Sequence, residues 1–501
     1  MRDLPRDIWL EIVRFIPPNF SPALYRVNRT LFAIYLDQRY RCVSIGHAKT
    51  SRTHHCLLQL KQVLKELHIN PHLLGKLFTP CLEQPQESGW LDRLSTSARH
   101  LGLLSQHTFR PTADSMQHIS YLAKQLRNVT KLHFESEWCY SRSLEFILCT
   151  PFIHGGWTAY GSQLHILHWD FPIEAFRLYF PPSLTLEGLE ELNLHLFTVE
   201  FSANTTLDIL NTIISPFVNR HCNTIRHLAI KCFQPWRIGS LLASLKPIPQ
   251  LRSLDLVYPV LHGVQNPDKF GIHEFLRIYA LTLQHFKLQF HSSSTENGPK
   301  LLRAKPSWYD QEIFEVPLRN LESLDLGLDG YSLPVISGLT NYLRHFKDPL
   351  KRIVLRDHHF LYDDILAIST ALTGVRLNSL VIELNHLSPE LFDLLSTKFP
   401  YLKDLQLMFR VLTEKETYTF AARQNYQHNQ LVRDFNDAME SRVYINWNLQ
   451  HLTMHPERFS CGMLQHCHES IVKSLPGVLS FNSLSREDYL DVYQRQLSDR
   501  K

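Results

Sequence analysis

The side chains in this sequence that are best suited to chemistry are its 28 histidines and nine cysteines. Imidazole, thiolate and carboxylate groups bind metal ions, but protein metal sites recur at paired spacings such as C-x2-C with a matching second half. Neither of the two richest stretches has such a spacing, so we expect scattered histidines, no metal site and no cofactor. The two stretches are Cys461 with His466, Cys467 and His468, and Asp357-His358-His359 with Asp363-Asp364.

Motifs of known catalytic chemistry are also missing from the sequence. It contains no P-loop, no G-x-G-x-x-G, no G-x-S-x-G and no H-E-x-x-H. No cysteine is paired with a base in a recognisable pattern. We therefore expect no catalytic residue in this chain, which predicts that it is not an enzyme by itself.

The composition is that of an ordinary globular chain. Of its 501 residues, 44% are hydrophobic and 20% are charged, and 52 basic against 48 acidic side chains leave a net charge of +4. So balanced a charge predicts no nucleic-acid partner and no membrane-surface partner, and no stretch is apolar over the ~18 residues of a membrane span. Thinly spread cysteines, odd in number, predict reduced thiols and a location in the cytoplasm, the nucleus or both.

The first 45 residues predict three short helices. Residues 4–16 are amphipathic, because Ile8, Ile12 and Ile16 recur on one helical face, and Pro17 then stops the helix. Two further short helical stretches follow. A module of this size has a poor surface-to-volume ratio, so a partner or the next domain must cover its apolar residues.

These residues resemble the F-box family. Its pattern is Leu-Pro, an acidic residue, an apolar helix and a Val-x-Arg step into a last helix, and the linker Asn19–Ala23 departs from the family's usual Pro-x-Asp-Leu. Val27-Asn28-Arg29 with Arg39-Tyr40-Arg41 looks like the fungal members in particular. The positions in register are Leu4, Pro5, Asp7, Ile8, Ile12, Phe15, Ile16, Leu24, Val27, Arg29 and Phe32.

Members of the F-box family bind the Skp-type adaptor of cullin–RING ubiquitin ligases, and the resemblance implies the same partner here. The other interpretation is a helical cap on the following domain, which needs no partner. The residues expected to contact the adaptor are Leu4, Pro5, Ile8, Ile12, Phe15, Ile16, Leu24, Val27, Leu31 and Phe32.

From about residue 126 onwards, one phrase recurs: apolar-x-x-apolar-x-apolar. Several consecutive copies start 25 to 29 residues apart, as Leu377 and Leu402 do, which is within the leucine-rich-repeat period of about 20–29 residues. The other gaps are longer and require insertions. The copies start at Val129, Leu164, Leu189, Ile225, Leu251, Leu283, Leu321, Leu350, Leu377, Leu402 and Leu449.

Helical patterns lie between these phrases, for example at Leu361–Leu372 and after Ser388-Pro389. We therefore predict an α/β fold: a three-helix F-box followed by a leucine-rich-repeat-like solenoid, with a parallel sheet on its concave side. The copy from Leu377 to Leu387 resembles the full family pattern, including Asn385. The alternative is a single α/β domain whose strands merely alternate with helices.

The predicted domain boundaries follow from these patterns. We expect the F-box at 1–45, a helical linker at 46–125, the solenoid at 126–460, and a C-terminal cap with a frayed tail at 461–501. Insertions are expected near 292–306, which is rich in serine and proline, and at 414–441, which is polar and compatible with a helix.

In a solenoid, the polar positions of successive strands form one continuous surface. Its mixed charges predict a protein target of unknown identity. The chain is thus predicted to be the substrate-recognition subunit of an SCF-type ubiquitin ligase, and the alternative is a leucine-rich-repeat scaffold outside any ligase. The residues predicted to contact a target are His133, Asn193, His227, Asp255, Lys287, Asp325, Arg352, Arg356 and Glu383.

Overall fold

The computed structural model divides into two compact units. The first comprises the described residues up to Lys231 together with Ser244–Gln250, and the second comprises Cys232–Ala243 and the described residues from Leu251 onwards. The structure describes residues 8–9, 11, 30, 34, 42–45, 64–69, 117, 120–121, 123–135, 145–198, 207–232, 238–260, 271–292, 312–327, 336–346, 349–413, 428–457, 464 and 466–498.

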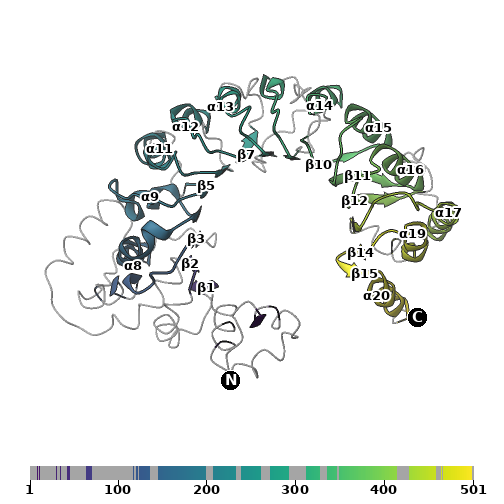
Figure 1. Ribbon diagram of the computed structural model, residues 1–501, viewed down its shortest axis with the longest axis horizontal. Helices are drawn as coiled ribbons and strands as arrows, with labels where there is room; N and C mark the ends of the chain where they lie inside the picture. The colour runs from purple at the N-terminus through teal and green to yellow at the C-terminus, as the bar shows by residue number, and fades with distance from the viewer. Residues whose placement is uncertain are drawn as a thin grey trace, which may run out of the picture. The chain divides into compact units, whose positions relative to one another are not determined.

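The first unit contains a sheet whose strands follow one another in chain order (Figure 1). Strands β1 to β4 each pair in parallel with the next strand, and β6 lies beside β5. The strands are β1 Cys42–Ile45, β2 Glu66–Ile69, β3 Lys131–Glu135, β4 Ile166–Asp170, β5 Glu191–Leu196 and β6 His227–Cys232. The helices are α8 Glu145–Tyr160, η3 Gly161–Gln163, α9 Ile173–Tyr179, η4 Leu210–Ile214 and α11 Ser215–Arg220.

These strands form because apolar and polar residues alternate along them. In β5, Leu192, Leu194 and Leu196 are at most 1% exposed, whereas Asn193 between them is half-buried. One face of the sheet therefore packs against the helices, and the other carries the polar side chains. Under β3 and β4 the packed layer is aromatic, with the rings of Phe134 and Trp169 centred 5.1 Å apart.

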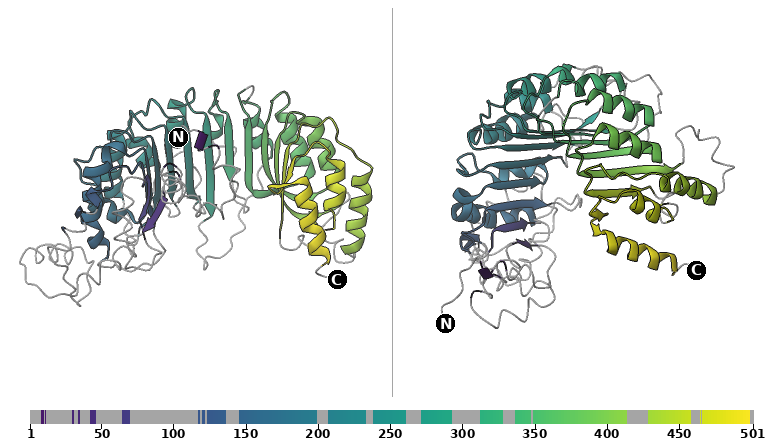
Figure 2. Two further views of the ribbon diagram at one scale, coloured as in Figure 1. Left: turned by 60° about the horizontal axis from the view of Figure 1, so that its bottom comes forward. Right: turned by 45° about the vertical axis from the view of Figure 1, so that its right-hand side comes forward.

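The second unit repeats this arrangement, with the helices again on one face of its strands (Figure 2). Strands β7 to β14 pair in parallel in chain order, and β15 closes the sheet antiparallel to β14. The strands are β7 Ser253–Val260, β8 His285–Ser292, β9 Ser323–Gly327, β10 Arg352–Phe360, β11 Ser379–Leu387, β12 Asp404–Leu412, β13 His451–Pro456, β14 Ser480–Phe481 and β15 Leu484–Ser485. The helices are α12 Ile238–Ser244, α13 Ile272–Ile278, η7 Glu312–Glu315, α14 Ile336–Leu343, α15 Tyr362–Ala371, α16 Pro389–Lys398, α17 His428–Glu440, α19 His468–Ser474 and α20 Arg486–Ser498.

The predicted alternation of strands and helices is confirmed in both units. Helix α15 matches the pattern at Leu361–Leu372, and α16 begins as expected, because the Ser388 hydroxyl accepts a hydrogen bond of 3.3 Å from the Leu391 N–H and Pro389 takes the first turn. Asn385, the asparagine of the best-matching copy, is half-buried within β11.

Two of the predicted boundaries are wrong. Residues 46–125 were expected to be helical, yet β2 lies inside them and pairs in parallel with β3. Residues 42–45, assigned to the F-box, form β1 and pair with β2. For β2 the reason lies in the sequence: an apolar-x-x-apolar-x-apolar phrase also occurs at Leu64, Leu67 and Ile69, all of which are fully buried. The sheet therefore begins well before residue 126.

The C-terminal tail is also more ordered than predicted. Residues 486–501 were expected to fray, but α20 extends to Ser498. Tyr489 is fully buried against Phe481, with ring centroids 5.2 Å apart, and the Arg486 guanidinium donates to the carbonyl of Val472 at 2.7 Å. Among the described residues, the structure shows no helix that is both long and apolar enough to cross a membrane.

Candidate functional site

The nine residues predicted to contact a target all lie on strands, next to positions whose side chains are buried. They therefore occupy the polar positions of the strands in each unit, as their alternation predicts, although target binding itself stays a prediction. His133, Asn193 and His227 belong to the first unit, and Asp255, Lys287, Asp325, Arg352, Arg356 and Glu383 belong to the second.

In the first unit, parallel register aligns three imidazoles, which we call the histidine row: His68 on β2, His133 on β3 and His168 on β4. The rings of His68 and His133 stack, with centroids 4.1 Å apart and planes 3° apart. His168 meets His133 edge-on at the same centroid distance of 4.1 Å. Asn193 continues the row on β5.

Carboxylates flank the histidine row. On one side, Glu66 Oε1 lies 3.0 Å from His68 Nε2 and 3.2 Å from His133 Nε2. On the other side, Glu135 Oε1 lies 2.5 Å from His68 Nδ1. His133 Nε2 is within ion-pair distance of Glu66, yet it is buried and makes no hydrogen bond. Each imidazole nitrogen of His68 thus faces a carboxylate.

Farther along the row, Glu191 Oε1 lies 3.0 Å from His168 Nε2 and accepts a hydrogen bond of 2.8 Å from the Asn193 amide. The hydrogen bond from His168, ahead of that from Asn193 and against the effect of burial, lowers the pKa of Glu191 to about 2. His227 on β6 contributes its charge to the same shift. The predicted residues Asn193 and His227 therefore act on one carboxylate.

Burial sets the charge of the central imidazole. It lowers the pKa of His133 to about 4, with help from the neighbouring His168 and His68, although Glu66 and Glu135 oppose the shift. Burial alone would raise the pKa of Glu66, but the hydrogen bond from His68 and the charges of His133 and Lys131 outweigh it and lower that pKa. At neutral pH the first unit's face therefore combines neutral imidazole at its centre with ionised carboxylate.

A small hollow of about 190 Å³ lies beside the histidine row. Pockets that enclose small-molecule ligands usually measure about 300–1,000 Å³, so this hollow fits a partner's side chain better than a whole metabolite. Its polar lining comes from His133, Glu135, His168, Asp170, Asn193, His195 and Lys231.

In the second unit, the register places opposite charges side by side. Asp255 on β7 lies opposite Lys287 on β8, which lies opposite Asp325 on β9. The Arg356 guanidinium reaches Asp325 Oδ2 at 3.1 Å. Burial raises the pKa of Asp325, while the charges of Arg356, Lys287 and the nearby Arg352 oppose that rise. Five predicted residues thus form one group of charges.

Strand β10 contains a bulge next to Arg356, at the end of this group of charges. The register of β10 against β11 shifts between Leu355 and Phe360, and Asp357 adopts a left-handed φ of 61°. Its Oδ2 accepts a 3.2 Å hydrogen bond from Gln289 Nε2, above Gly327, where a Cβ would lie 2.7 Å from that oxygen. Glycine at position 327 therefore leaves the room that the bulge needs.

Glu383 lies beside the bulge on β11. Burial raises the pKa of this carboxyl, the Asp357 N–H that donates to it lowers the pKa, and the charge of Asp357 raises it again. Glu383 therefore belongs to the same polar surface as Arg356, and burial favours the protonated form of its carboxyl.

The side chains of the two histidine-rich stretches considered in the sequence analysis make contacts within the fold. Asp364 Oδ2 accepts a 2.8 Å hydrogen bond from the Leu361 N–H at the start of α15, and His359 contacts Glu457 at 3.2 Å. Cys467 and His468 are buried, and the Tyr489 hydroxyl hydrogen-bonds His468 Nδ1. Within the described residues, the group whose ligand atoms lie within 4.8 Å of one another is Cys42, Glu66 and His68.

Sequence reasoning missed Cys42, Glu66, His68 and Glu191 as site residues. The first three precede residue 126, where no strand was expected, although the buried phrase at Leu64, Leu67 and Ile69 signals β2. Of the predicted adaptor contacts, Ile8 is described and is 47% exposed. The others lie outside the described residues: Leu4, Pro5, Ile12, Phe15, Ile16, Leu24, Val27, Leu31 and Phe32.

Comparisons with known proteins show no family for this chain. No family model matches it, and no curated protein matches it. The crystal structure of the yeast Rad7 and Elc1 complex contains a chain that is similar to this one at 14% identity, over 91% of this chain and 94% of that chain, with a TM-score of 0.40. That similarity is too low to support an inference about function.

Proposed function

We propose that this chain is the substrate-recognition subunit of an SCF-type cullin–RING ubiquitin ligase in the cytoplasm or nucleus. Residues 4–41 bind the Skp-type adaptor, and the polar faces of the leucine-rich-repeat-like sheets bind a target protein. The first half rests on the F-box resemblance, which covers about forty residues in order. The second half rests on the geometry of the sheets.

The observation that carries target binding is the display of polar side chains by successive parallel strands. In the second unit, Asp255, Lys287 and Asp325 come from three neighbouring strands and are held in register by the backbone. Such a preorganised row of alternating charge favours a protein surface of complementary charge, because little side-chain freedom is lost on binding. The small hollow beside His133 agrees with this, since it fits a side chain.

Under this proposal the chain performs no chemistry itself. It holds a target near the subunit that carries activated ubiquitin, and the acceleration comes from raised effective concentration. The adaptor side is apolar: an exposed residue such as Ile8 would contribute about 25 cal/mol per Å² of apolar surface buried, before the cost of association.

The test is adaptor co-purification with a double substitution, Leu4→Ala with Pro5→Ala. We expect loss of the Skp-type adaptor and, with it, the cullin. The matched control is Ile278→Ala, an apolar residue that is 57% exposed on α13 and should leave adaptor recovery unchanged. Adaptor recovery that is equal in all three proteins would show the docking proposal to be wrong.

A truncation of the N-terminal residues tests the same proposal, and the position of β1 decides how many residues can be removed. Removal of residues 1–41 leaves β1 intact, whereas removal of residues 1–45 would also delete the strand that pairs with β2. The shorter deletion should lose the adaptor yet keep its target. Proteomics of captured proteins, full chain against this deletion, then separates adaptor-dependent partners from direct targets.

The second candidate is a leucine-rich-repeat scaffold outside any ligase, with the N-terminal residues acting as a cap. It is favoured by the position of β1, because stacked repeats need a polar end unit and residues 1–41 directly precede that edge strand. A scaffold would be recovered without adaptor. Deletion of residues 1–41 would then lower its thermal stability and leave the set of proteins recovered with it unchanged.

A further inference from the structure

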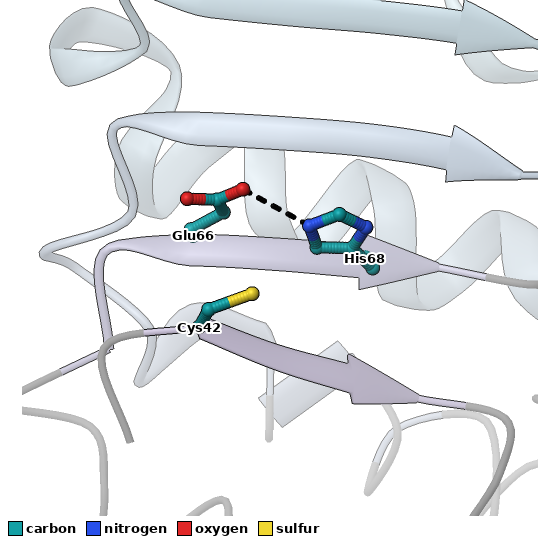
Figure 3. Close-up of side chains that lie close together, drawn as sticks. All are labelled: Cys42, Glu66 and His68. Carbon is teal, nitrogen blue, oxygen red and sulfur yellow. Dashed lines mark hydrogen bonds and ion pairs between the residues drawn. The ribbon is translucent and has the colours of Figure 1, made fainter. Parts of the chain in front are cut away.

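We propose that Cys42, Glu66 and His68 form a zinc-binding site on the first two strands of the first unit. The proposal does not depend on the ligase assignment and departs from the expectation of no metal site. The three side chains share one face of neighbouring strands, with Cys42 of β1 beside Glu66 and His68 of β2 (Figure 3). Parallel pairing sets Cys42 opposite Glu66, and Glu66 and His68 stand two residues apart on one face.

The distances suit a zinc ion after small side-chain adjustments. One thiol sulfur, one carboxylate oxygen and one imidazole nitrogen lie within 4.8 Å of one another. Bond lengths of about 2.0–2.3 Å in a tetrahedral site put such ligand atoms roughly 3.3–3.8 Å apart. The required approach is about 1 Å, and the Cys42 side chain is exposed and therefore free to adjust. Cysteine, histidine and carboxylate together form a donor set that zinc favours.

The partners of His68 give an independent reason for a cation at this point. A neutral imidazole carries one N–H, yet Glu135 faces Nδ1 at 2.5 Å and Glu66 faces Nε2 at 3.0 Å. With the N–H at Nδ1 donated to Glu135, the lone pair of Nε2 points at carboxylate oxygen. A metal ion between Nε2 and Glu66 satisfies both groups, and Glu135 then orients the ligand in the carboxylate–histidine–zinc manner.

His133 adds a second signal from the neighbouring strand. Its Nε2 is buried, has no hydrogen-bond partner and lies 3.2 Å from the same Glu66 oxygen. A buried nitrogen that makes no hydrogen bond, beside a carboxylate that already faces another nitrogen, indicates that a positive centre belongs at Glu66. With three protein ligands, the fourth zinc position is left for water.

Zinc here would act as a clamp between β1 and β2. These strands pair over only four residues, Cys42–Ile45 with Glu66–Ile69, and β1 is the edge of the sheet. One ion bound by side chains of both strands would stabilise that pairing. Since β1 begins directly after the residues that resemble an F-box, the ion would stabilise the strand that follows them in the chain.

The experiment is zinc binding to the full-length chain, purified under reducing conditions, stripped with a chelator and reloaded. Elemental analysis after desalting should find about one zinc in the wild type that is absent from Cys42→Ser and from His68→Gln. The matched controls, Cys222→Ser and His165→Gln, change a cysteine and a histidine of the same unit outside the cluster and should keep the zinc. Glu135→Gln should keep the site but weaken it by about 10–100-fold.

Two further readouts separate ligand loss from misfolding. Cobalt(II) loading should give a thiolate charge-transfer band that disappears in Cys42→Ser, while the stripped wild type and this variant should unfold at the same temperature, since Cys42 is exposed. Zinc should also slow amide exchange in β1 of the wild type alone. Zinc that survives both ligand substitutions, or a wild-type chain that retains none, would overturn the proposal.

Discussion

The polar faces of the two units differ in the chemistry of their charges. In the first unit, imidazoles stack between carboxylates, so the charge depends on bound protons and, under our proposal, on zinc. In the second unit, the basic side chains of Arg356 and Lys287 lie beside aspartates. The same strand–helix architecture therefore supports one face built from imidazoles between carboxylates and another built from guanidinium and ammonium groups beside carboxylates.

The difference also extends below the two faces. The histidine row lies over an aromatic layer, in which Trp169 packs on Phe134 and Phe176 with ring centroids 5.1 and 4.9 Å away. The corresponding strands of the second unit bury mainly leucine, such as Leu324, Leu326 and Leu355. Large rigid rings fix the strand positions from which the imidazoles project, so the row's geometry depends on few residues.

The largest effect should come from removing one of these rings. Trp169 is 1% exposed between the neighbours His168 and Asp170, and Trp169→Ala should lower the free energy of unfolding by about 3–5 kcal/mol through lost packing and a cavity. Urea denaturation measures the loss, and amide exchange should rise in β3 and β4. Ile278→Ala, at an exposed site, should change stability by less than about 0.5 kcal/mol. If Trp169→Ala changes the free energy of unfolding as little as Ile278→Ala does, the aromatic layer does not support the histidine row.

The second prediction concerns how the stability of the second unit depends on pH. Burial, with the charges of His359 and Arg410, lowers the pKa of His358 to about 4 from 6.5. Between these values the unfolded chain binds the extra proton, so stability falls as the pH drops from 6.5 towards 4. At pH 5 the loss should be on the order of 2 kcal/mol for this group.

His358→Gln should flatten that part of the pH profile, as measured by urea denaturation at pH 7 and pH 5. His345→Gln, an exposed histidine of the same unit, is the control and should leave the wild-type profile unchanged. If wild type and His358→Gln lose the same stability between the two pH values, His358 does not contribute, and the contrast between the two faces becomes sharper.

Much of the second unit could be predicted from the sequence. Repeats spaced 25–29 residues apart leave room for one strand, one helix and short turns, so β10 to β12 and their helices appear where the apolar phrases predict them. Alternation then places Asp325 and Glu383 on the polar face without further information. What alternation cannot predict is the bulge at Asp357, because it depends on Gly327 and Gln289 of other strands.

The first unit was harder to predict for a physical reason. Its strands are short, and the phrase that starts at Leu64 lies 65 residues before the phrase at Val129, so the repeat spacing does not link β2 to β3. Without β2, Glu66 could not be placed opposite Cys42 and Lys131, and His68 could not be placed opposite His133. The histidine row exists only through pairing between distant strands, and such pairing is not encoded in local spacing.

The third prediction tests whether the bulge at Asp357 in the second unit needs glycine at position 327. In Gly327→Ala, the new Cβ would lie 2.5 Å from Gln289 Cγ and 2.7 Å from Asp357 Oδ2, so these side chains must move apart. Losing their hydrogen bond should cost about 1 kcal/mol. Gly477→Ala is the matched control, since its new Cβ would come no closer than 3.5 Å to the Trp447 carbonyl oxygen. Equal stability of the two variants, measured by urea denaturation, would show that the bulge does not need glycine at position 327.

The smallest effect should come from the flank of the histidine row. The hydrogen bond from His168 lowers the pKa of Glu191 to about 2 from 4.5, so the folded state gains stability above pH 4.5 and loses it as the pH falls through 2. Because both side chains are about one-third exposed, Glu191→Gln should cost only about 0.5–1 kcal/mol at pH 7.

A double-mutant cycle with His168→Gln measures that coupling directly, and exposed Glu187→Gln is the control. The coupling should shrink steadily in acid below pH 4.5 as Glu191 gains its proton. A coupling that is the same at pH 7 and at pH 3 would show that Glu191 and His168 merely pack together. The first unit's face would then owe its character to Glu66 and Glu135 alone, at the end of the row where we place zinc.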